Sequence, residues 1–497
     1  MNWFATGVSL LVPFFLTPFV VRSLGPAAYG VWILSVSTVS YLNLLDLGMR
    51  SAIIRFVSRA QARQETSEIK STVGAALWFR VLLSSVVALL SALLAVLFPH
   101  LFKVPAELEH AAQVTVLLCA LGVAATLISG VFGAVLAAIH RFDLLSTVSM
   151  CQTLARAAGV LVILSSGRGL VSLAIWEIAV ISLAGCATIV IAIRTFPDCR
   201  VRLTRPNMAA LRGLWSYSFI TFIWIIANQV IISTDNLVVG AFVSVGLVSF
   251  YSIGSSLLSY SGQLTSALST TFTPMASGME ANGHFDKVRE LLLRGTQSTL
   301  AIALPVCVAL LFRGRTFIGL WMGPSYMEVS GNVLHILMIS QYFAIGSSTA
   351  GSIMMAISKH KPVAYAALIE AILNLGATLL VVRSTGIYGV AWATALAMAL
   401  VHLVFWPPYL RKTLNMPILP FLWEGWGKIT LCALPFAAVC AVADATWHPH
   451  NLGVFFLQVL LTLPVYALTL LIVFRGEAMN LFHKWRASRL QQTPLPF

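Results

Sequence analysis

A run of residues without a single charged side chain extends from Ser23 to Leu45, and comparable apolar runs recur along the chain. A helix needs about twenty apolar residues to cross the hydrocarbon core of a membrane, and these runs have that length. The chain as a whole is 59% hydrophobic and only 10% charged, whereas soluble domains carry about 25% charged residues. The sequence therefore predicts an all-α polytopic membrane protein.

About fourteen apolar segments can be delimited, and the loops between them are too short to hold a soluble domain. The division of residues 214–275 is the least defined, with its turn expected near residues 243–246. We therefore expect about fourteen transmembrane helices, at residues 2–22, 27–47, 71–98, 111–137, 145–165, 170–193, 214–239, 247–275, 295–312, 330–357, 363–382, 388–408, 425–445 and 452–474.

Most of the 31 lysines and arginines fall in the loops on one side of the membrane, the side of the N-terminus. Because cytoplasmic loops are enriched in these residues, both termini are predicted to be cytoplasmic. The first run lacks a basic start and a cleavage site, and is interpreted as a membrane helix and not as a signal peptide. Much of the formal net charge of +14 therefore reflects topology, and nucleic acid is not an expected partner.

The loop at residues 195–213 contains two prolines and four arginines and divides the first twelve segments into two groups of six. Segments one and seven end similarly, in VVRSLGPAAYGVWILS and LVVGAFVSVGLVSFYSIGSS. Internal repeats around a midplane cavity are typical of transporters. We expect two pseudo-symmetric six-helix lobes around a central cavity, at 1–205 and 206–415, two further helices within 416–475 and a cytoplasmic tail at 476–497.

Among the ionisable side chains of the predicted membrane helices, five stand out as site candidates, because a charge costs roughly 2.5–3.5 kcal/mol at the helix centre. Such residues normally face a cavity or a partner. They are Arg80, Arg156, Glu177, Asp235 and Glu370.

Arg156 lies near the middle of its helix, and Glu177 on the next helix is a candidate partner. Arg80 either lines a cavity or extends its side chain to the cytoplasmic surface. Glu370 and Asn374, four residues apart, either bind a coupling ion or hydrogen-bond to neighbouring helices.

One face of segment seven combines aromatic, polar and acidic residues. Tyr217, Trp224, Asn228 and Asp235 are spaced 7, 4 and 7 residues apart and fall close to one line along a helix. The stripe either forms a cavity wall, with Tyr217 and Trp224 stacking on sugars, or Asp235 pairs locally and Asn228 bonds to a neighbour.

A basic stretch follows segment two. Asp46 and Arg50 are four residues apart and favour an intrahelical ion pair, unless Gly48 ends the helix between them. Arg55, Arg59 and Arg63 recur every four residues with apolar residues close by, which predicts a short amphipathic helix at the inner membrane surface. This helix either contacts anionic lipid, or Arg50 and Arg55 guard an inward-facing opening and collect a phosphate group.

No metal and no cofactor are expected. The seven cysteines occur singly, which predicts neither disulfides nor structural zinc. His448 and His450 are the only close histidine pair. A nucleotide-binding P-loop motif is absent from the sequence.

Two stretches, LLVPFFLTPFVVRSLGPAAYGVWILS and YLNLLDLGMRSAIIRFVSRA, resemble the start of bacterial polysaccharide (O-antigen type) flippases. These belong to the polysaccharide transporter family of the multidrug/oligosaccharidyl-lipid/polysaccharide (MOP) exporter superfamily. The resemblance rests on the two prolines of the first helix, the R-x-L-G-P-x-x-Y-G turn from Arg22 to Gly30, and the L-L-D-L-G-x-x-x-A element from Leu44 to Ala52.

The resemblance implies a flippase and not an enzyme. It would move undecaprenyl-pyrophosphate-linked oligosaccharide repeat units from the cytoplasmic to the outer leaflet of the bacterial inner membrane, by alternating access. Such transport serves the biosynthesis of lipopolysaccharide or another surface polysaccharide. The partners that the resemblance implies are the lipid-linked substrate, membrane lipids, a polysaccharide polymerase and chain-length machinery. A basic cavity would hold the pyrophosphate headgroup, a role assigned by depth and helix face to Arg22, Arg50, Arg55, Arg80 and Arg156.

Two other functions stay open. The first is an ion-coupled multidrug or small-molecule antiporter of the same superfamily, which would need an acidic cavity to attract cations. The arginines Arg80 and Arg156 inside the membrane helices argue against this function. A membrane polysaccharide polymerase or glycosyltransferase would need a larger outer loop than this chain offers. The residues predicted to couple an ion or line the cavity are Asp46, Glu177, Asn228, Asp235, Glu370 and Asn374.

Overall fold

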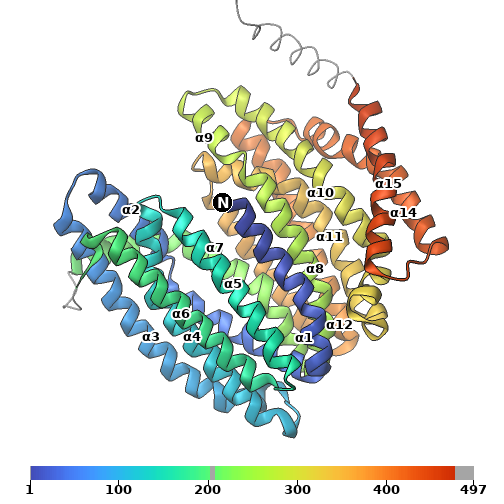
Figure 1. The fold of residues 1–497 in the computed structure, drawn as a ribbon. Helices are drawn as coiled ribbons and strands as arrows, with labels where there is room; N and C mark the ends of the chain where they lie inside the picture. The colour runs from blue at the N-terminus through green and yellow to red at the C-terminus, as the bar shows by residue number, and fades with distance from the viewer. Residues whose placement is uncertain (1, 202–207, 476–497) are drawn as a thin grey trace, which may run out of the picture. The chain divides into compact units, whose positions relative to one another are not determined.

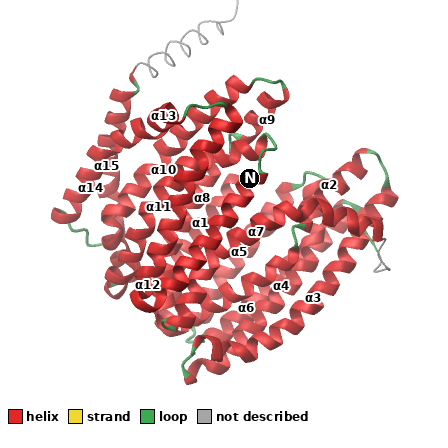
Figure 2. Cartoon of the chain, turned by 180° about the vertical axis from the view of Figure 1, so that it is seen from behind, coloured by secondary structure: helices red, strands yellow, loops and turns green. Residues whose placement is uncertain are grey.

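The computed structural model describes residues 2–201 and 208–475, and within them the side chains outside residues 2–6, 9 and 208–221. This part of the chain is helical almost throughout and contains no strand (Figures 1 and 2). The α-helices are α1 (Asn2–Ser40), α2 (Met49–Ala62), α3 (Thr66–Phe102), α4 (Glu109–Ala138), α5 (Phe142–Ser165), α6 (Leu170–Thr195), α7 (Met208–Phe242), α8 (Val245–Thr270), α9 (Thr273–Ala281), α10 (Phe285–Met322), α11 (Pro324–Ala356), α12 (Lys361–Leu414), α13 (Ile418–Pro420), α14 (Lys428–Thr446) and α15 (Leu452–Val473). Tighter or wider turns form η1 (Tyr41–Asp46), η2 (Ala106–Leu108), η3 (Pro197–Cys199) and η4 (Phe421–Gly427).

Eleven continuous helical stretches of the described chain are long and apolar enough to cross a membrane. Two of them contain two predicted segments each, because α1 is interrupted at Gly25 and α12 at Gly386. The helix α8, which is not among these eleven stretches, corresponds to a further predicted segment. It is separated from α7 by residues 243–244, where the turn was expected. The prediction of an all-α membrane protein with about fourteen transmembrane helices is therefore confirmed.

The interruption of α1 follows from its local sequence. A proline disfavours the helical conformation in the residue before it, and Pro26 follows Gly25. Gly25 has φ 76° and ψ 167°, a backbone conformation that is open to glycine and costly for other residues. The Leu24-Gly25-Pro26 sequence thus ends one membrane crossing and begins the next without a separate loop.

The chain divides into two compact units. The first comprises residues 1–253 and 361–397, and the second comprises residues 254–360 and 398–497. The lobe boundaries expected from the sequence stay a prediction. The predicted tail at 476–497, and residues 202–207 of the predicted linker, lie outside the described residues.

In the first unit, α4 packs against α3 and α6 (Figure 1). The short basic helix predicted after segment two is present as α2, and its apolar side packs into this bundle. Met49, Ile53 and Val57 are buried there, and the Ser58 hydroxyl donates a 2.8 Å hydrogen bond to the carbonyl of Ala138. The apolar side of α2 therefore contacts protein, not lipid, while its arginines stay exposed.

In the second unit, a buried arginine connects the last two long helices to α10. Arg313 is 1% exposed, and its Nη2 donates to Oε1 of Gln458 on α15 at 2.6 Å. Its guanidinium carbon lies 4.9 Å from the centre of the Phe455 ring, and its Nε lies 3.9 Å from Oδ1 of Asp444 on α14. These contacts fix α14 and α15 against α10.

Candidate functional site

Arg80 forms a buried ion pair with Asp46. Arg80 lies inside α3, and its Nη2 donates to Oδ1 of Asp46 at the end of η1. The Arg80 side chain is 3% exposed, whereas that of Asp46 is 29% exposed. Arg80 therefore does not extend to the cytoplasmic surface, the alternative considered from the sequence.

The prediction that Asp46 forms an intrahelical ion pair with Arg50 is wrong. Leu47 and Gly48 adopt left-handed conformations, with φ of 53° and 70°, and they separate η1 from α2. Arg50 then lies on α2 as an exposed side chain, while the carboxylate of Asp46 points to α3. The alternative prediction, a helix break at Gly48, describes the chain better.

Arg156 and Glu177 form a bidentate pair between α5 and α6. Nε of Arg156 donates to Oε2 of Glu177 at 2.8 Å, and Nη2 donates to Oε1 at 2.5 Å. The predicted pairing is confirmed. The Arg156 side chain is 41% exposed and that of Glu177 is 16% exposed. Since the carboxylate occupies one edge of the guanidinium, the other edge is open to a second anion.

The pair depends on a close approach of α5 and α6. The indole ring of Trp176 lies directly on Gly159, and its Nε1 donates a 3.1 Å hydrogen bond to the carbonyl of Ala155. A Cβ atom at Gly159 would overlap the ring. A glycine at this position thus allows the two helices to align Arg156 with Glu177.

Gly159→Ala is expected to lower the thermal stability of the purified protein. Overpacking of a close contact costs about 1–3 kcal/mol, and the Trp176 ring must move to admit the methyl group. Thermal unfolding in detergent, followed by tryptophan fluorescence, measures the effect. Gly74→Ala is the control, because a Cβ atom there meets nothing within 4 Å. Equal unfolding temperatures for the two variants would contradict this packing account.

A buried polar cluster lies around Asp235 in the first unit. Asp235 on α7 is 5% exposed, and its Oδ2 accepts hydrogen bonds from Tyr251 on α8 at 2.6 Å and from Thr394 on α12 at 2.7 Å. The Thr394 hydroxyl also lies 3.3 Å from Oδ1 of Asn374, which accepts a 3.0 Å hydrogen bond from Thr378. Three helices therefore contribute oxygen atoms to one buried site.

Oxygen acceptors outnumber donors in this cluster. The single Thr394 hydroxyl proton faces Asp235 Oδ2, Asn374 Oδ1 and the carbonyl of Val390, which is 3.1 Å away. Oδ1 of Asp235 is buried and has no hydrogen-bond partner among the described residues. An unmatched buried carboxylate oxygen is costly, and a proton or a small cation such as Na⁺ would balance it.

The remaining predicted residues of this group are on α7 and α12. Glu370 is 7% exposed and lies one helical turn before Asn374 on α12. Asn228 donates a 2.9 Å hydrogen bond to the carbonyl of Trp224 in its own helix, and Trp224 is 41% exposed. The predicted stripe on α7 therefore has an exposed part and a buried end at Asp235. The side chain of Tyr217 lies outside the described residues.

Arg22 and Arg55 are exposed side chains on α1 and α2. Arg80 and Arg156, in contrast, lie inside long apolar helices and form ion pairs with Asp46 and Glu177.

Sequence reasoning missed Tyr251 and Thr394. Tyr251 belongs to the FYSIGSS stretch that follows α7, so it was close to the segment already singled out. Thr394 is 159 residues from Asp235, and a threonine inside an apolar helix carries no local signal of a polar partner. Only the packing of α12 on α7 and α8 reveals it.

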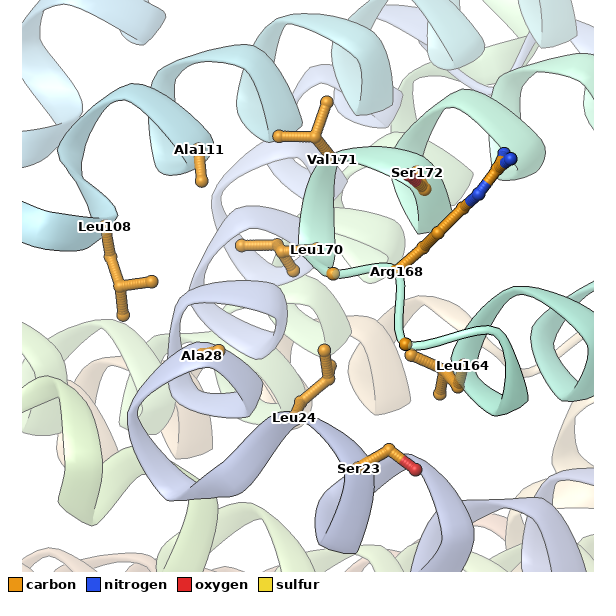
Figure 3. A pocket seen from close by; sticks show the side chains of 12 residues that line it. Ser23, Leu24, Ala28, Leu108, Ala111, Leu164, Arg168, Leu170, Val171 and Ser172 are labelled. Atoms are coloured by element: carbon orange, nitrogen blue, oxygen red, sulfur yellow. The ribbon is translucent and has the colours of Figure 1, made fainter.

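A cavity of about 450 Å³ lies in the first unit beside the break in α1. Leu24, Ala28, Leu108 and Leu170 give it an apolar lining, and Figure 3 shows the side chain of Arg168 extending away from them. The cavity contains none of the predicted site residues. It lies at the ends of helices predicted to face the outer side of the membrane.

The sequence matches known proteins over most of its length. Residues 19–331 match the family described as "Polysaccharide biosynthesis protein". The membrane protein EpsK of Bacillus subtilis, described as uncharacterized, is 23% identical over 82% of this chain and 81% of its own length. A putative O-antigen transporter of Shigella flexneri is 21% identical over 78% of this chain and 91% of its own length.

Solved structures share the fold. The lipid II flippase MurJ, in an inward closed conformation, superposes with a TM-score of 0.77 at 18% identity, over 96% of this chain and 99% of its own. An inward-facing multidrug resistance MATE family transporter of the MOP superfamily gives a TM-score of 0.72 at 11% identity, over 83% and 94%. The resemblance found in the first 60 residues is confirmed, and the chain belongs to the polysaccharide biosynthesis protein family and has the fold of the MOP superfamily.

Proposed function

We propose that this protein is a flippase for undecaprenyl-pyrophosphate-linked oligosaccharide and not an enzyme. The observation that supports this most directly is the Arg156–Glu177 pair, because it sets a half-exposed guanidinium inside membrane helices with one edge open. Guanidinium groups bind phosphate oxygens in a bidentate manner. The names of relatives agree, since they include a putative O-antigen transporter and a lipid II flippase.

In this proposal the protein lies in the bacterial inner membrane with both termini in the cytoplasm. The headgroup enters from the cytoplasmic side and leaves toward the outer leaflet, where a polymerase with chain-length machinery uses the oligosaccharide. Arg80 and Arg156 bind the pyrophosphate. A proton or Na⁺ at the Asp235 cluster drives the conformational cycle, because it would neutralise the carboxylate whose buried Oδ1 has no hydrogen-bond partner among the described residues.

Removal of the protein from its native cell tests the proposal. We expect lipid-linked oligosaccharide to accumulate on the inner leaflet and surface polysaccharide to be lost. The wild-type protein should restore both, and Arg156→Ala should not. Arg141→Ala is the matched control, since Arg141 forms an exposed bidentate pair with Asp143. Restoration by Arg156→Ala to the same level as the control would refute the assigned role of Arg156.

The second candidate is an ion-coupled multidrug antiporter. The buried acidic cluster at Asp235 favours it, because a carboxylate attracts cations. The two arginine–carboxylate pairs favour the flippase, because they place cationic groups inside the membrane helices, and such groups attract anions and repel a cationic drug. A deletion strain with normal lipid-linked pools and raised drug sensitivity would support the antiporter and contradict the flippase.

A further inference from the structure

We propose that Asp46 is a place-holding anion. In the empty protein it neutralises Arg80, and a phosphate oxygen of the substrate headgroup takes its place when substrate binds. This inference rests on the proposed flippase function and assigns a binding step to one residue pair. The proposed pair differs from a permanent ion pair because the Asp46 carboxylate must move away from Arg80 when the headgroup binds.

The first argument is the unequal burial of the partners. Arg80 is 3% exposed and lies in the middle of the long helix α3, so its guanidinium is fixed. Asp46 is 29% exposed. An incoming anion therefore meets the pair from the side of the carboxylate, and the carboxylate is the partner that can move.

The second argument is the backbone that follows Asp46. The turn η1 ends at this residue, and Leu47 and Gly48 continue in left-handed conformations before α2 begins at Met49. Left-handed conformations are unfavourable for a leucine. A short joint of this kind can change its backbone angles without disturbing α2, whose apolar side is held in the bundle.

The third argument is the incomplete pairing of Arg80. Only its Nη2 bonds to Asp46, and its Nε is buried without a hydrogen-bond partner among the described residues. The Arg156–Glu177 pair, in contrast, uses both Nε and Nη2. A pyrophosphate offers more acceptor oxygens than one carboxylate, and it could satisfy the Arg80 Nε that Asp46 leaves unpaired.

The test measures binding of inorganic pyrophosphate to the purified full-length protein in detergent. Asp46→Asn should bind pyrophosphate at least about tenfold tighter than the wild type. In the wild type, the Asp46–Arg80 pair must open before the anion binds, and if the closed pair is populated about 90% of the time, the apparent affinity is reduced about tenfold. The variant lacks the competing carboxylate and does not have this loss of affinity. The gain should disappear in the double variant Asp46→Asn/Arg80→Gln. Asp143→Asn, which breaks an exposed arginine pair, should bind like the wild type.

Further arms identify the ligand. Farnesyl pyrophosphate should show the same gain if the site takes a lipid headgroup, and sulfate should show little. A gain with inorganic pyrophosphate but not with the prenyl compound would reject the headgroup as the occupant. Unchanged or weaker pyrophosphate binding by Asp46→Asn would overturn the proposal and leave the pair a structural contact.

Folding of the variant gives a second readout. Asp46→Asn leaves Arg80 buried without a counter-charge, so it could fail to fold in ordinary buffer. Purification in pyrophosphate should then restore a monodisperse protein, since the anion replaces the lost carboxylate. Failure of this rescue would contradict the proposal. If the wild type restores transport in cells while these binding tests fail, only the role of Asp46 falls and the flippase function stands.

Discussion

Asp235→Asn is expected to abolish the dependence of transport on an ion gradient while leaving the protein folded. Asparagine has nearly the same shape but carries no charge, so the unpartnered carboxylate oxygen Oδ1 is removed from the buried site. The site in this variant then resembles the wild-type site with its ion bound, but it has no proton or Na⁺ to release. Coupling free energies between two sites are typically about 1–3 kcal/mol, so the stimulation by the gradient that the variant loses should be about 5- to 150-fold.

Proteoliposomes with imposed proton or Na⁺ gradients provide the measurement. Thr394→Val separates the two ions, because it removes an oxygen ligand that Na⁺ needs and leaves the carboxylate able to take a proton. Asp198→Asn, on η3 outside this cluster, serves as the control. Unchanged gradient dependence in Asp235→Asn would remove this cluster from the coupling mechanism.

The Asp46–Arg80 pair should give an asymmetric double-mutant cycle. Loss of one partner of a buried ion pair costs about 3–5 kcal/mol, because it leaves an uncompensated charge. Asp46→Ala leaves the 3% exposed guanidinium of Arg80 unpaired, whereas Arg80→Met leaves a carboxylate that is 29% exposed. Asp46→Ala should therefore destabilise the protein more than Arg80→Met.

The double variant should be more stable than Asp46→Ala alone, since no buried charge remains. Reversible unfolding in mixed micelles, followed by tryptophan fluorescence, gives the free energy of unfolding of each variant. Equal and additive losses would mean that the two side chains do not interact as an ion pair.

Local sequence was sufficient to predict the membrane helices, because the condition for forming one depends only on neighbouring residues. A membrane helix needs only enough consecutive apolar residues, and the breaks at Gly25 and between α7 and α8 lie where the sequence predicts turns. The pairing of Arg156 with Glu177 was also predictable, since the two residues lie at mid-depth on consecutive helices. Both inferences use residues close together along the chain.

The polar contacts between distant segments were not predictable. Asp46 had a nearby candidate partner in Arg50, and only the left-handed turn at Leu47 and Gly48 directs its carboxylate to Arg80, 34 residues away. Asp235 was a candidate site residue by its charge and by its place in the polar stripe of segment seven. Its partners Tyr251 and Thr394 come from helices whose contact no spacing encodes.

The sequence by itself determined that this chain crosses the membrane many times, which residues form the crossings and which family it resembles. Apolar length, loop charge and a terminal motif are properties of short segments, and they survive any arrangement of the helices. The tertiary structure alone decided which partners from distant segments meet Asp46 and Asp235, and which buried oxygen atom stays without a partner among the described residues. A hydrogen bond requires an approach of about 3 Å, and such proximity is set by the packing of α3, α7, α8 and α12.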